Sequence, residues 1–213
     1  MSDIKLYTYW RSSASWRVRI ALHHKGIDFE SIFVNLLKGE QASSRCHPDE
    51  FKATNPTGLV PALVINGETI LESPAILELL EELFPERPLL PKDPIARAKV
   101  RAIANIIGCD IHPVQNLRVL KYAGQDRMAE WAKHFIDLGF EGLEKVVKGT
   151  AGKYCFGDEV TLADVFLVPQ IGNAVRWGVD MSKFPTLAAI GDRLGELDAF
   201  RKAHPTAQPD AAN

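Results

Sequence analysis

The chain has few cysteines, and they are scattered. Only three occur among its 213 residues: Cys46, Cys109 and Cys155. An odd number at wide spacing argues against a disulfide framework and against a zinc site, because both need cysteines in closely spaced sets. His47 follows Cys46, but with no further ligand nearby the pair is better explained as part of a solvated loop. We therefore expect reduced thiols and no bound metal.

Long apolar runs and an excess of either charge are also missing. No stretch approaches the roughly 20 apolar residues of a membrane-spanning helix, and the N-terminus lacks the basic and apolar regions of a signal peptide. We therefore expect a cytoplasmic protein without a membrane partner. The formal net charge is -2 and the lysines and arginines are scattered, which excludes the basic stripe of a nucleic-acid-binding protein.

The composition that remains is ordinary for a globular protein, with 46% hydrophobic and 24% charged residues. The length allows one domain or two small ones. Residues 4–9 alternate in side-chain character and residues 28–34 are rich in β-formers, so both are predicted strands. The apolar spacing between them predicts a helix that ends at Gly26, which makes the first 34 residues a βαβ unit.

Turn signals organise the next segment. After a polar loop and a short helix ending near Lys52, Asn66-Gly67 stands between two β-rich runs, which is the strongest short signal for a hairpin. Pro61 cannot donate to a strand ladder, so it must stand at a strand start. Ser73-Pro74 predicts an N-cap followed by proline at the first position of a helix. The predicted order is βαβαββα.

A proline-rich segment divides the chain. β-signals almost vanish after it, so we predict a first domain at residues 1–84, a linker at 85–92 and an all-helical domain at 93–213. In the helical domain, Asp93-Pro94 starts a long helix that Pro113 is expected to kink. Other predicted helices cover residues 126–147, 165–175 and 185–197, and Thr161 with Asp164 forms a capping box.

Three hydroxyls lie where the first helix begins. Ser12, Ser13 and Ser15 follow the predicted turn, and the free N–H groups of a helix start make a site for an anion such as a thiolate. The simpler alternative is that one serine caps the helix, which explains the same pattern without a ligand. The pattern by itself leaves both interpretations open.

Residues 12–22, SSASWRVRIAL, resemble the signature SSCSWRVRIAL of zeta-class glutathione transferases, a class that includes maleylacetoacetate isomerase. The similarity extends from about residue 4 to about residue 209. Ala14 departs from the signature, which usually has cysteine there. The resemblance implies a thioredoxin-like domain followed by a helical substrate-binding domain, a cis Val60-Pro61 bond and a homodimer.

The resemblance also implies glutathione as the cofactor. This anionic tripeptide needs helix N-termini for its carboxylates, a backbone edge for pairing and a hydroxyl near its sulfur. By resemblance, Ser12 bonds the sulfur with help from Ser13, the Val60 backbone pairs with the cysteinyl part, and Glu72 and Ser73 bind the γ-glutamyl ammonium and carboxylate. The expected cofactor-binding residues of the first domain are Ser12, Ser13, Ser15, Val60, Glu72 and Ser73.

Further residues are expected to bind an anionic small-molecule substrate. An isomerase for a maleyl-acyl acid must hold a carboxylate and polarise an enone oxygen, roles that the resemblance gives to Arg11, Arg176 and His112. His112, Asn116 and Arg118 match places where the family contacts cofactor, although Arg118 replaces a smaller residue of animal members. The residue types alone equally allow a packed histidine and surface ion pairs. The expected catalytic residues are Ser12, Ser13, Arg11, Arg176 and His112.

The expected reaction is glutathione-dependent cis-trans isomerisation of maleylacetoacetate in aromatic-ring catabolism. Maleylpyruvate is the alternative acid, because residues 109–113 resemble bacterial enzymes that act on it. A conjugating transferase or a peroxidase would use the same thiolate but consume glutathione. A non-catalytic interaction module would be expected to have lost the serines or Glu72-Ser73, and both are present. Arg17 and Arg19, inside the first helix, are interpreted as structural or as contributors at the dimer side of the site.

Overall fold

The computed structural model describes residues 4–34 and 48–212. These form two compact units. The first contains the described residues up to Arg87 together with those from Asp198 onward, and the second is Pro88–Leu197. The sequence analysis had placed residues from 198 onward in the helical domain. The Cys46-His47 pair and residues 37–47 of the predicted polar loop lie outside the described residues.

The first unit is built on a four-stranded sheet with the order β2-β1-β3-β4. β1 pairs parallel with β2 and antiparallel with β3, and β3 pairs antiparallel with β4. Asn66 and Gly67 have φ values of 53° and 82°, the left-handed backbone that a tight hairpin requires, so the predicted hairpin is confirmed. The Val60-Pro61 bond is cis, as the resemblance implied. The strands are β1 (Ile4–Thr8), β2 (Glu30–Phe33), β3 (Ala62–Ile65) and β4 (Glu68–Leu71).

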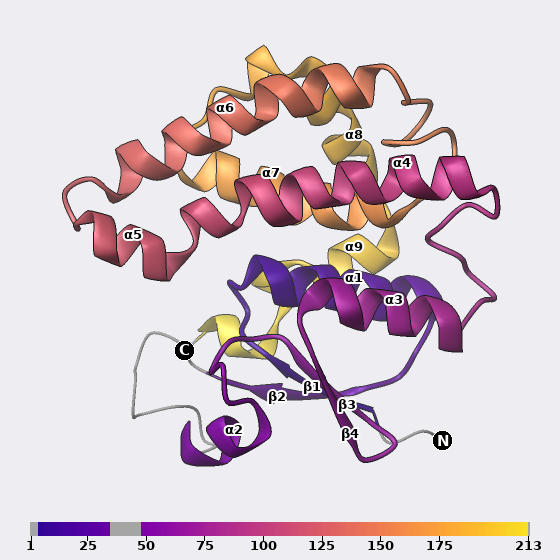
Figure 1. Ribbon diagram of the computed structural model, residues 1–213, viewed down its shortest axis with the longest axis vertical. Helices are drawn as coiled ribbons and strands as arrows, with labels where there is room; N and C mark the ends of the chain where they lie inside the picture. Colours follow the sequence, from indigo (N-terminus) through magenta and orange to yellow (C-terminus); the bar gives the residue numbers. More distant parts are fainter. Residues whose placement is uncertain (1–3, 35–47, 213) are drawn as a thin grey trace. The chain divides into compact units, whose positions relative to one another are not determined.

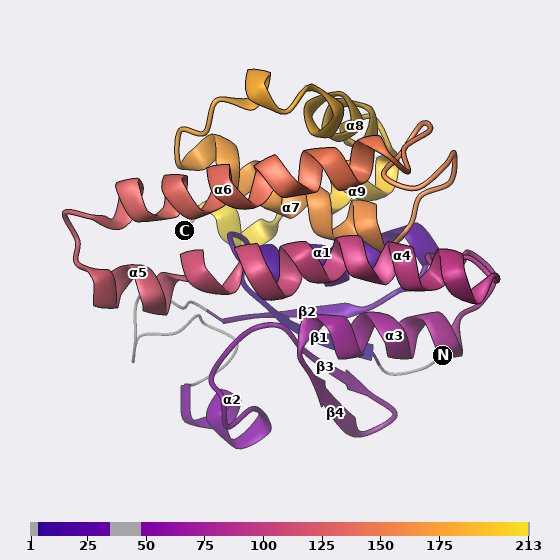
Figure 2. The same cartoon turned by 45° about the horizontal axis from the view of Figure 1, so that its top comes forward.

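Helices cover this sheet. Figures 1 and 2 show α1 and α3 on one of its faces and α2 on the other side. On the α2 side, Phe51 packs in a cluster with Tyr9, Val34, Val60 and Ala62. The helices of the first unit are α1 (Ser13–Lys25), α2 (Pro48–Thr54), α3 (Ser73–Leu83) and α9 (Asp198–Ala203), and α9 packs against α1.

The second unit contains α-helices and shorter helical turns. α7 packs against both α4 and α8, as Figure 2 shows for α4 and α7. Phe140 and Phe184 meet edge to face, with ring centroids 5.4 Å apart. The helices are α4 (Pro94–Asn105), α5 (Leu117–Ala123), α6 (Met128–Lys148), α7 (Leu162–Arg176) and α8 (Pro185–Gly195), and one further short turn spans Met181–Lys183.

The predicted break near Pro113 is broader than a simple kink. α4 ends at Asn105 and continues as a π-helix over Ile106–Ile111, followed by a 3-10 turn at Pro113–Gln115. A methyl group at Gly108 would lie 2.8 Å from Phe166, so the π-helix packs closely against α7. The apolar spacing alone had indicated one continuous helix here.

The predicted capping box is present at the start of α7. Asp164 accepts from the Thr161 backbone N–H at 2.8 Å and from the Cys155 backbone N–H at 2.9 Å. Burial raises the pKa of Asp164 above its ordinary value, while these hydrogen bonds act in the opposite direction. No helix in the described part of the chain is long and apolar enough to cross a bilayer.

Candidate functional site

Residues 9–13, here called the serine turn, connect β1 to α1. The Ser12 N–H donates to the Tyr9 carbonyl at 3.0 Å, and Ser12 is the N-cap of α1, with its Oγ accepting from the Ser15 N–H at 3.1 Å. Capping uses a lone pair of the hydroxyl oxygen, and a hydroxyl also carries a proton that it donates. The capping and ligand-binding interpretations of Ser12 are therefore compatible.

The other two serines differ in position. Ser13 is buried as the first residue of α1. Ser15 is completely buried, and its Oγ has no hydrogen-bond partner among the described residues. Ser15 thus acts on Ser12 through its backbone N–H, and direct contact of its hydroxyl with a cofactor stays a prediction. Half-buried Ala14 lies between them.

Arg11 provides a cation at the same turn. Its guanidinium carbon lies 5.3 Å from the centroid of the Trp10 ring, within range of a cation–π contact. Arg11 is half-buried. Because Arg11 is only half-buried, its guanidinium can donate to a carboxylate without first moving out of the core.

The start of α3 differs from the prediction by one residue. Ser73 was expected to be the N-cap, but the helix begins at Ser73 and Glu72 occupies the cap position without a side-chain cap bond. Glu72 has a φ of 67°, which costs a non-glycine residue about 1 to 3 kcal/mol and is typical of functional sites. Its side chain is exposed, so it presents a carboxylate to solvent at a helix N-terminus.

Ser73 does not cap the helix, and its hydroxyl contacts Arg17. Arg17 Nη1 donates to Ser73 Oγ at 3.3 Å, and both residues are buried. Arg17 was expected to be structural or to contribute at the dimer side of the site. The sequence does contain one signal for such a contact: Arg17 is a cation in an otherwise apolar helical run. A charge that is buried with the apolar face requires a polar partner.

This contact brings the starts of α1 and α3 into reach of each other. Arg17 lies in the second turn of α1, and its side chain reaches the first residue of α3. Both helix starts carry free N–H groups, and such groups suit an anion.

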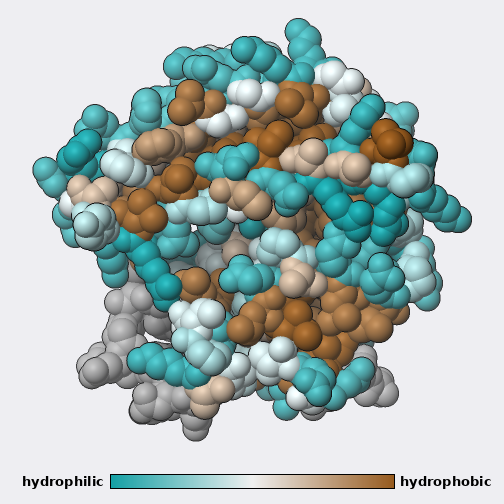
Figure 3. All heavy atoms as spheres, in the orientation of Figure 1, coloured by the Kyte–Doolittle hydropathy of each residue, from teal (hydrophilic) through white to brown (hydrophobic). Residues whose placement is uncertain are grey.

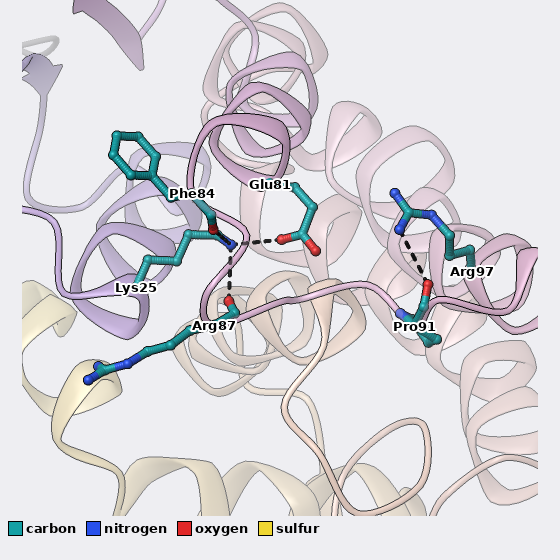
Figure 4. Close-up of polar contacts among 6 residues, drawn as sticks. All are labelled: Lys25, Glu81, Phe84, Arg87, Pro91 and Arg97. Atoms are coloured by element: carbon teal, nitrogen blue, oxygen red, sulfur yellow. Dashed lines mark hydrogen bonds and ion pairs between the residues drawn. The ribbon is translucent and has the colours of Figure 1, made fainter.

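The opposite ends of α1 and α3 are joined by a buried ion pair (Figure 4). Lys25 Nζ lies 2.8 Å from Glu81 Oε2, and the two side chains are 1% and 6% exposed. The same ammonium donates to the Phe84 and Arg87 carbonyls at 2.8 and 3.0 Å. These contacts fix α1 against α3 and so support the positions of their N-termini.

In the second unit, three expected site residues share one segment. His112 follows the π-helix, with its N–H donating to the Ile107 carbonyl at 2.9 Å. Asn116 is the N-cap of α5, and its Oδ1 accepts from the Arg118 N–H at 3.0 Å. His112 and Asn116 are half-buried and Arg118 is exposed. The three residues therefore all lie on the segment at the break near Pro113.

Arg176 comes from a different element of the second unit. It is the last residue of α7 and is exposed, where a cation is favoured by the helix dipole. Its guanidinium carbon lies 4.9 Å from the Trp177 ring centroid. Across residues 4–34 and 48–212, no three His, Cys, Asp or Glu side chains are placed to hold a metal ion.

Three kinds of comparison with known proteins agree with one another: a family model, related sequences and solved structures. Residues 11–83 match the family model described as glutathione S-transferase, N-terminal domain. The chain is 52% identical over 207 residues to a maleylacetoacetate isomerase of Mus musculus, which covers 96% of this chain and 94% of that protein.

Two solved structures are similar over almost their whole length. The holo structure of a maleylpyruvate isomerase, described as a bacterial zeta-class glutathione S-transferase, has a TM-score of 0.91 and 44% identity, covering 97% of this chain and 99% of that one. A maleylacetoacetate isomerase of Anaeromyxobacter dehalogenans with glutathione in its active site has a TM-score of 0.88 and 42% identity, covering 99% and 98%.

Proposed function

The chain belongs to the zeta class of glutathione transferases, and we propose that it catalyses the glutathione-dependent cis-trans isomerisation of a maleyl-acyl acid, with maleylacetoacetate as the substrate. The observation that carries the proposal is the contact between Arg17 and Ser73. It places a buried cation and a hydroxyl at the start of α3 and joins that helix to α1, whose N-cap is Ser12.

The residues present fit glutathione. Ser73 with Arg17 behind it suits the γ-glutamyl carboxylate, the exposed Glu72 carboxylate suits the ammonium, and the cis turn at Val60 presents backbone for pairing with the cysteinyl part. Ser12 donates its hydroxyl proton to the sulfur. When bound, glutathione supplies the thiolate that adds to the cis double bond and leaves after rotation about the resulting single bond.

The chain's own groups stabilise charge in this reaction. A hydroxyl donor and the positive end of α1 favour a thiolate over a thiol. Arg11, Arg176 and His112 are proposed to bind the acid's carboxylate and its enone oxygen, where a fixed donor contributes about 3 kcal/mol to transition-state stabilisation. Asn116 and Arg118 are proposed to contact glutathione. Ala14 offers no sulfur, so the nucleophile belongs to the cofactor.

Maleylpyruvate is the second candidate substrate. The similarity to the holo maleylpyruvate isomerase structure over nearly the whole chain supports it. A substrate panel with both acids, following absorbance and free thiol together, tests the function. An isomerase converts the acid at constant free thiol, a conjugating transferase or peroxidase consumes thiol, and an inactive module does neither. Either of the last two results would refute the proposal.

A homodimer in the cytoplasm is also proposed. Figure 3 shows hydrophobic side chains gathered on the first unit over the β3–β4 hairpin and α3, where Leu83 is 47% exposed. A second copy of the chain is a suitable cover for such a patch. Sedimentation of the purified protein gives the oligomeric state, and a monomer at working concentration would contradict this part of the proposal.

A further inference from the structure

The C-terminal segment, residues 198–212, contacts the serine turn directly. The Trp10 N–H donates to Asp210 Oδ2 at 2.9 Å, a contact between residues 200 positions apart. Trp10 lies inside the turn that the Ser12 N–H closes on the Tyr9 carbonyl. Its N–H takes no part in that closing bond and donates instead to Asp210 in a partly buried contact; an unpaired donor costs about 1 to 3 kcal/mol where it is buried.

Arg19 fixes the carbonyl groups of the same turn. This fully buried side chain donates to the Tyr9 carbonyl at 3.3 Å and to the Trp10 carbonyl at 3.1 Å. It also donates through Nε to the Ala203 carbonyl at 3.2 Å, which ties α9 to the turn. Burial lowers the pKa of Arg19 to about 10, and the nearby Asp210 opposes that shift, so the guanidinium is charged at neutral pH.

The turn is thus held on two sides. Arg19 holds the Tyr9 and Trp10 carbonyls, and Asp210 accepts from the Trp10 N–H, while Ser12 follows two residues later as the helix cap. Removal of the Asp210 acceptor leaves the backbone before Ser12 held on one side only. A displacement of a reacting group by about 1 Å can cost up to about 100-fold in rate.

We propose that Asp210 is a positioning residue for catalysis: its carboxylate fixes Trp10 and thereby the orientation of the Ser12 hydroxyl toward the sulfur of bound glutathione. The inference rests on the proposed function, because that function makes the glutathione sulfur the partner of the Ser12 hydroxyl. Asp210 touches neither cofactor nor substrate in this assignment and acts through the turn. Its second oxygen, Oδ1, is buried without a hydrogen-bond partner among the described residues. Oδ2 is therefore the oxygen that fixes the Trp10 N–H.

The test compares four proteins: the wild type, Asp210→Ala, Asp210→Asn and Gln208→Ala. The asparagine variant retains an acceptor for the Trp10 N–H. Gln208 is the matched control, because its Nε2 donates to the Lys202 and His204 carbonyls within the same segment and does not touch the turn. Turnover, the Michaelis constants and the ultraviolet absorbance of the bound thiolate against pH are measured for each.

We expect Asp210→Ala to lower kcat roughly tenfold or more and to raise the pKa of the bound glutathione thiol. The Michaelis constant of the acid should change little. Asp210→Asn and Gln208→Ala should both remain within about twofold of the wild type. If Asp210→Ala does not fold, Asp210→Glu, which displaces the acceptor by one methylene, should show the same effects in weaker form.

An unchanged kcat and thiol pKa in Asp210→Ala, or equal losses in Asp210→Ala and Gln208→Ala, would overturn the inference. These outcomes differ from failure of the proposed function. A wild type that binds glutathione but isomerises neither acid refutes that function, whereas the thiol titration of the variants still reports whether Asp210 positions Ser12.

Discussion

Arg17 on α1 donates to the Ser73 hydroxyl at the start of α3, 56 residues away, at 3.3 Å. The contact supports the proposed role of Ser73 as an anion site, since the guanidinium polarises the hydroxyl and adds its own positive field. Glu72, with its left-handed backbone, takes the cap position that Ser73 was expected to hold. In the proposed function, Ser73 binds the γ-glutamyl carboxylate and Glu72 caps α3 without a side-chain hydrogen bond.

Replacement of Arg17 should therefore affect cofactor binding more than chemistry. We expect Arg17→Met to raise the Michaelis constant of glutathione about 10- to 100-fold, since a hydrogen bond to a charged group contributes about 1.5 to 3 kcal/mol. The turnover number at saturating glutathione should stay within a few-fold. Arg11→Met is the control, because it should raise the constant of the acid instead. The reverse pattern would refute both assignments.

Ser12 combines capping with a proposed contact to sulfur, and the two roles separate experimentally. Ser12→Ala should lower turnover at least tenfold with little change in glutathione affinity, because most binding comes from the ends of the tripeptide. It should also lose about 1 kcal/mol of stability. Asp93→Ala is the control: Asp93 caps α4 through the Ala96 N–H at 2.8 Å and should lose similar stability with normal turnover. Near-normal turnover in Ser12→Ala would transfer the role to Ser13 or to the helix terminus.

Arg176 is proposed to bind the carboxylate of the acid. Its replacement by alanine should raise the Michaelis constant of the acid at least tenfold, as the loss of a charged hydrogen bond predicts, while that of glutathione changes far less. Arg127→Ala is the matched control, since Arg127 also lies over a tryptophan ring in the second unit, with its guanidinium carbon 6.0 Å from the Trp131 centroid. Equal effects on the two constants would count against a role for Arg176 in acid binding.

Local signals predicted most of the fold. Gly26 ends α1 with a φ of 70°, Asn66-Gly67 closes a hairpin and Thr161 opens α7 with its capping box, because each depends on residues close in sequence. The π-helix over Ile106–Ile111 was not predicted. Its apolar spacing is nearly that of an α-helix, and it depends on the close approach of α7 at Gly108.

The site was predicted less completely, because its supporting contacts join distant residues. Ser12, Glu72 and Ser73 carry short motifs that the resemblance recognised. Arg17 and Asp210 have no local signal for their partners, since these lie 56 and 200 residues away. The sequence left Arg17 and Arg19 as structural or as contributors at the dimer side of the site, and the fold supplies their partners.

The ion pair between Lys25 and Glu81 predicts a stability effect. Lys25→Met should cost about 3 to 5 kcal/mol of unfolding free energy, because it leaves a buried carboxylate without its partner. Adding Glu81→Leu should restore most of that loss. Lys202→Met is the control, since Lys202 pairs with Asp198 at 2.8 Å but both side chains are at least 60% exposed, and such pairs contribute about 0 to 1 kcal/mol. Urea unfolding measures all four proteins, and similar losses in Lys25→Met and Lys202→Met would contradict the prediction.

His24, in the last turn of α1, predicts a pH dependence of stability. Burial lowers its pKa below the ordinary value, and Lys25 and Arg87 add to the shift while Glu81 opposes it. The unfolded chain therefore binds a proton at His24 before the folded chain does. The stability from neutral His24 is complete above the unfolded pKa of about 6.5 and is lost as the pH falls through the lower folded value.

Unfolding free energies of the wild type and His24→Gln, measured in urea between about pH 7.5 and pH 5, check this. We expect the wild type to lose more stability than the variant as the pH falls. The variant should still lose some stability, because burial also lowers the pKa of His23. Asp164 and Asp210, whose pKa values burial raises, act in the opposite direction in both proteins, so the comparison cancels them. Equal losses in the two proteins would show that His24 does not couple protonation to folding.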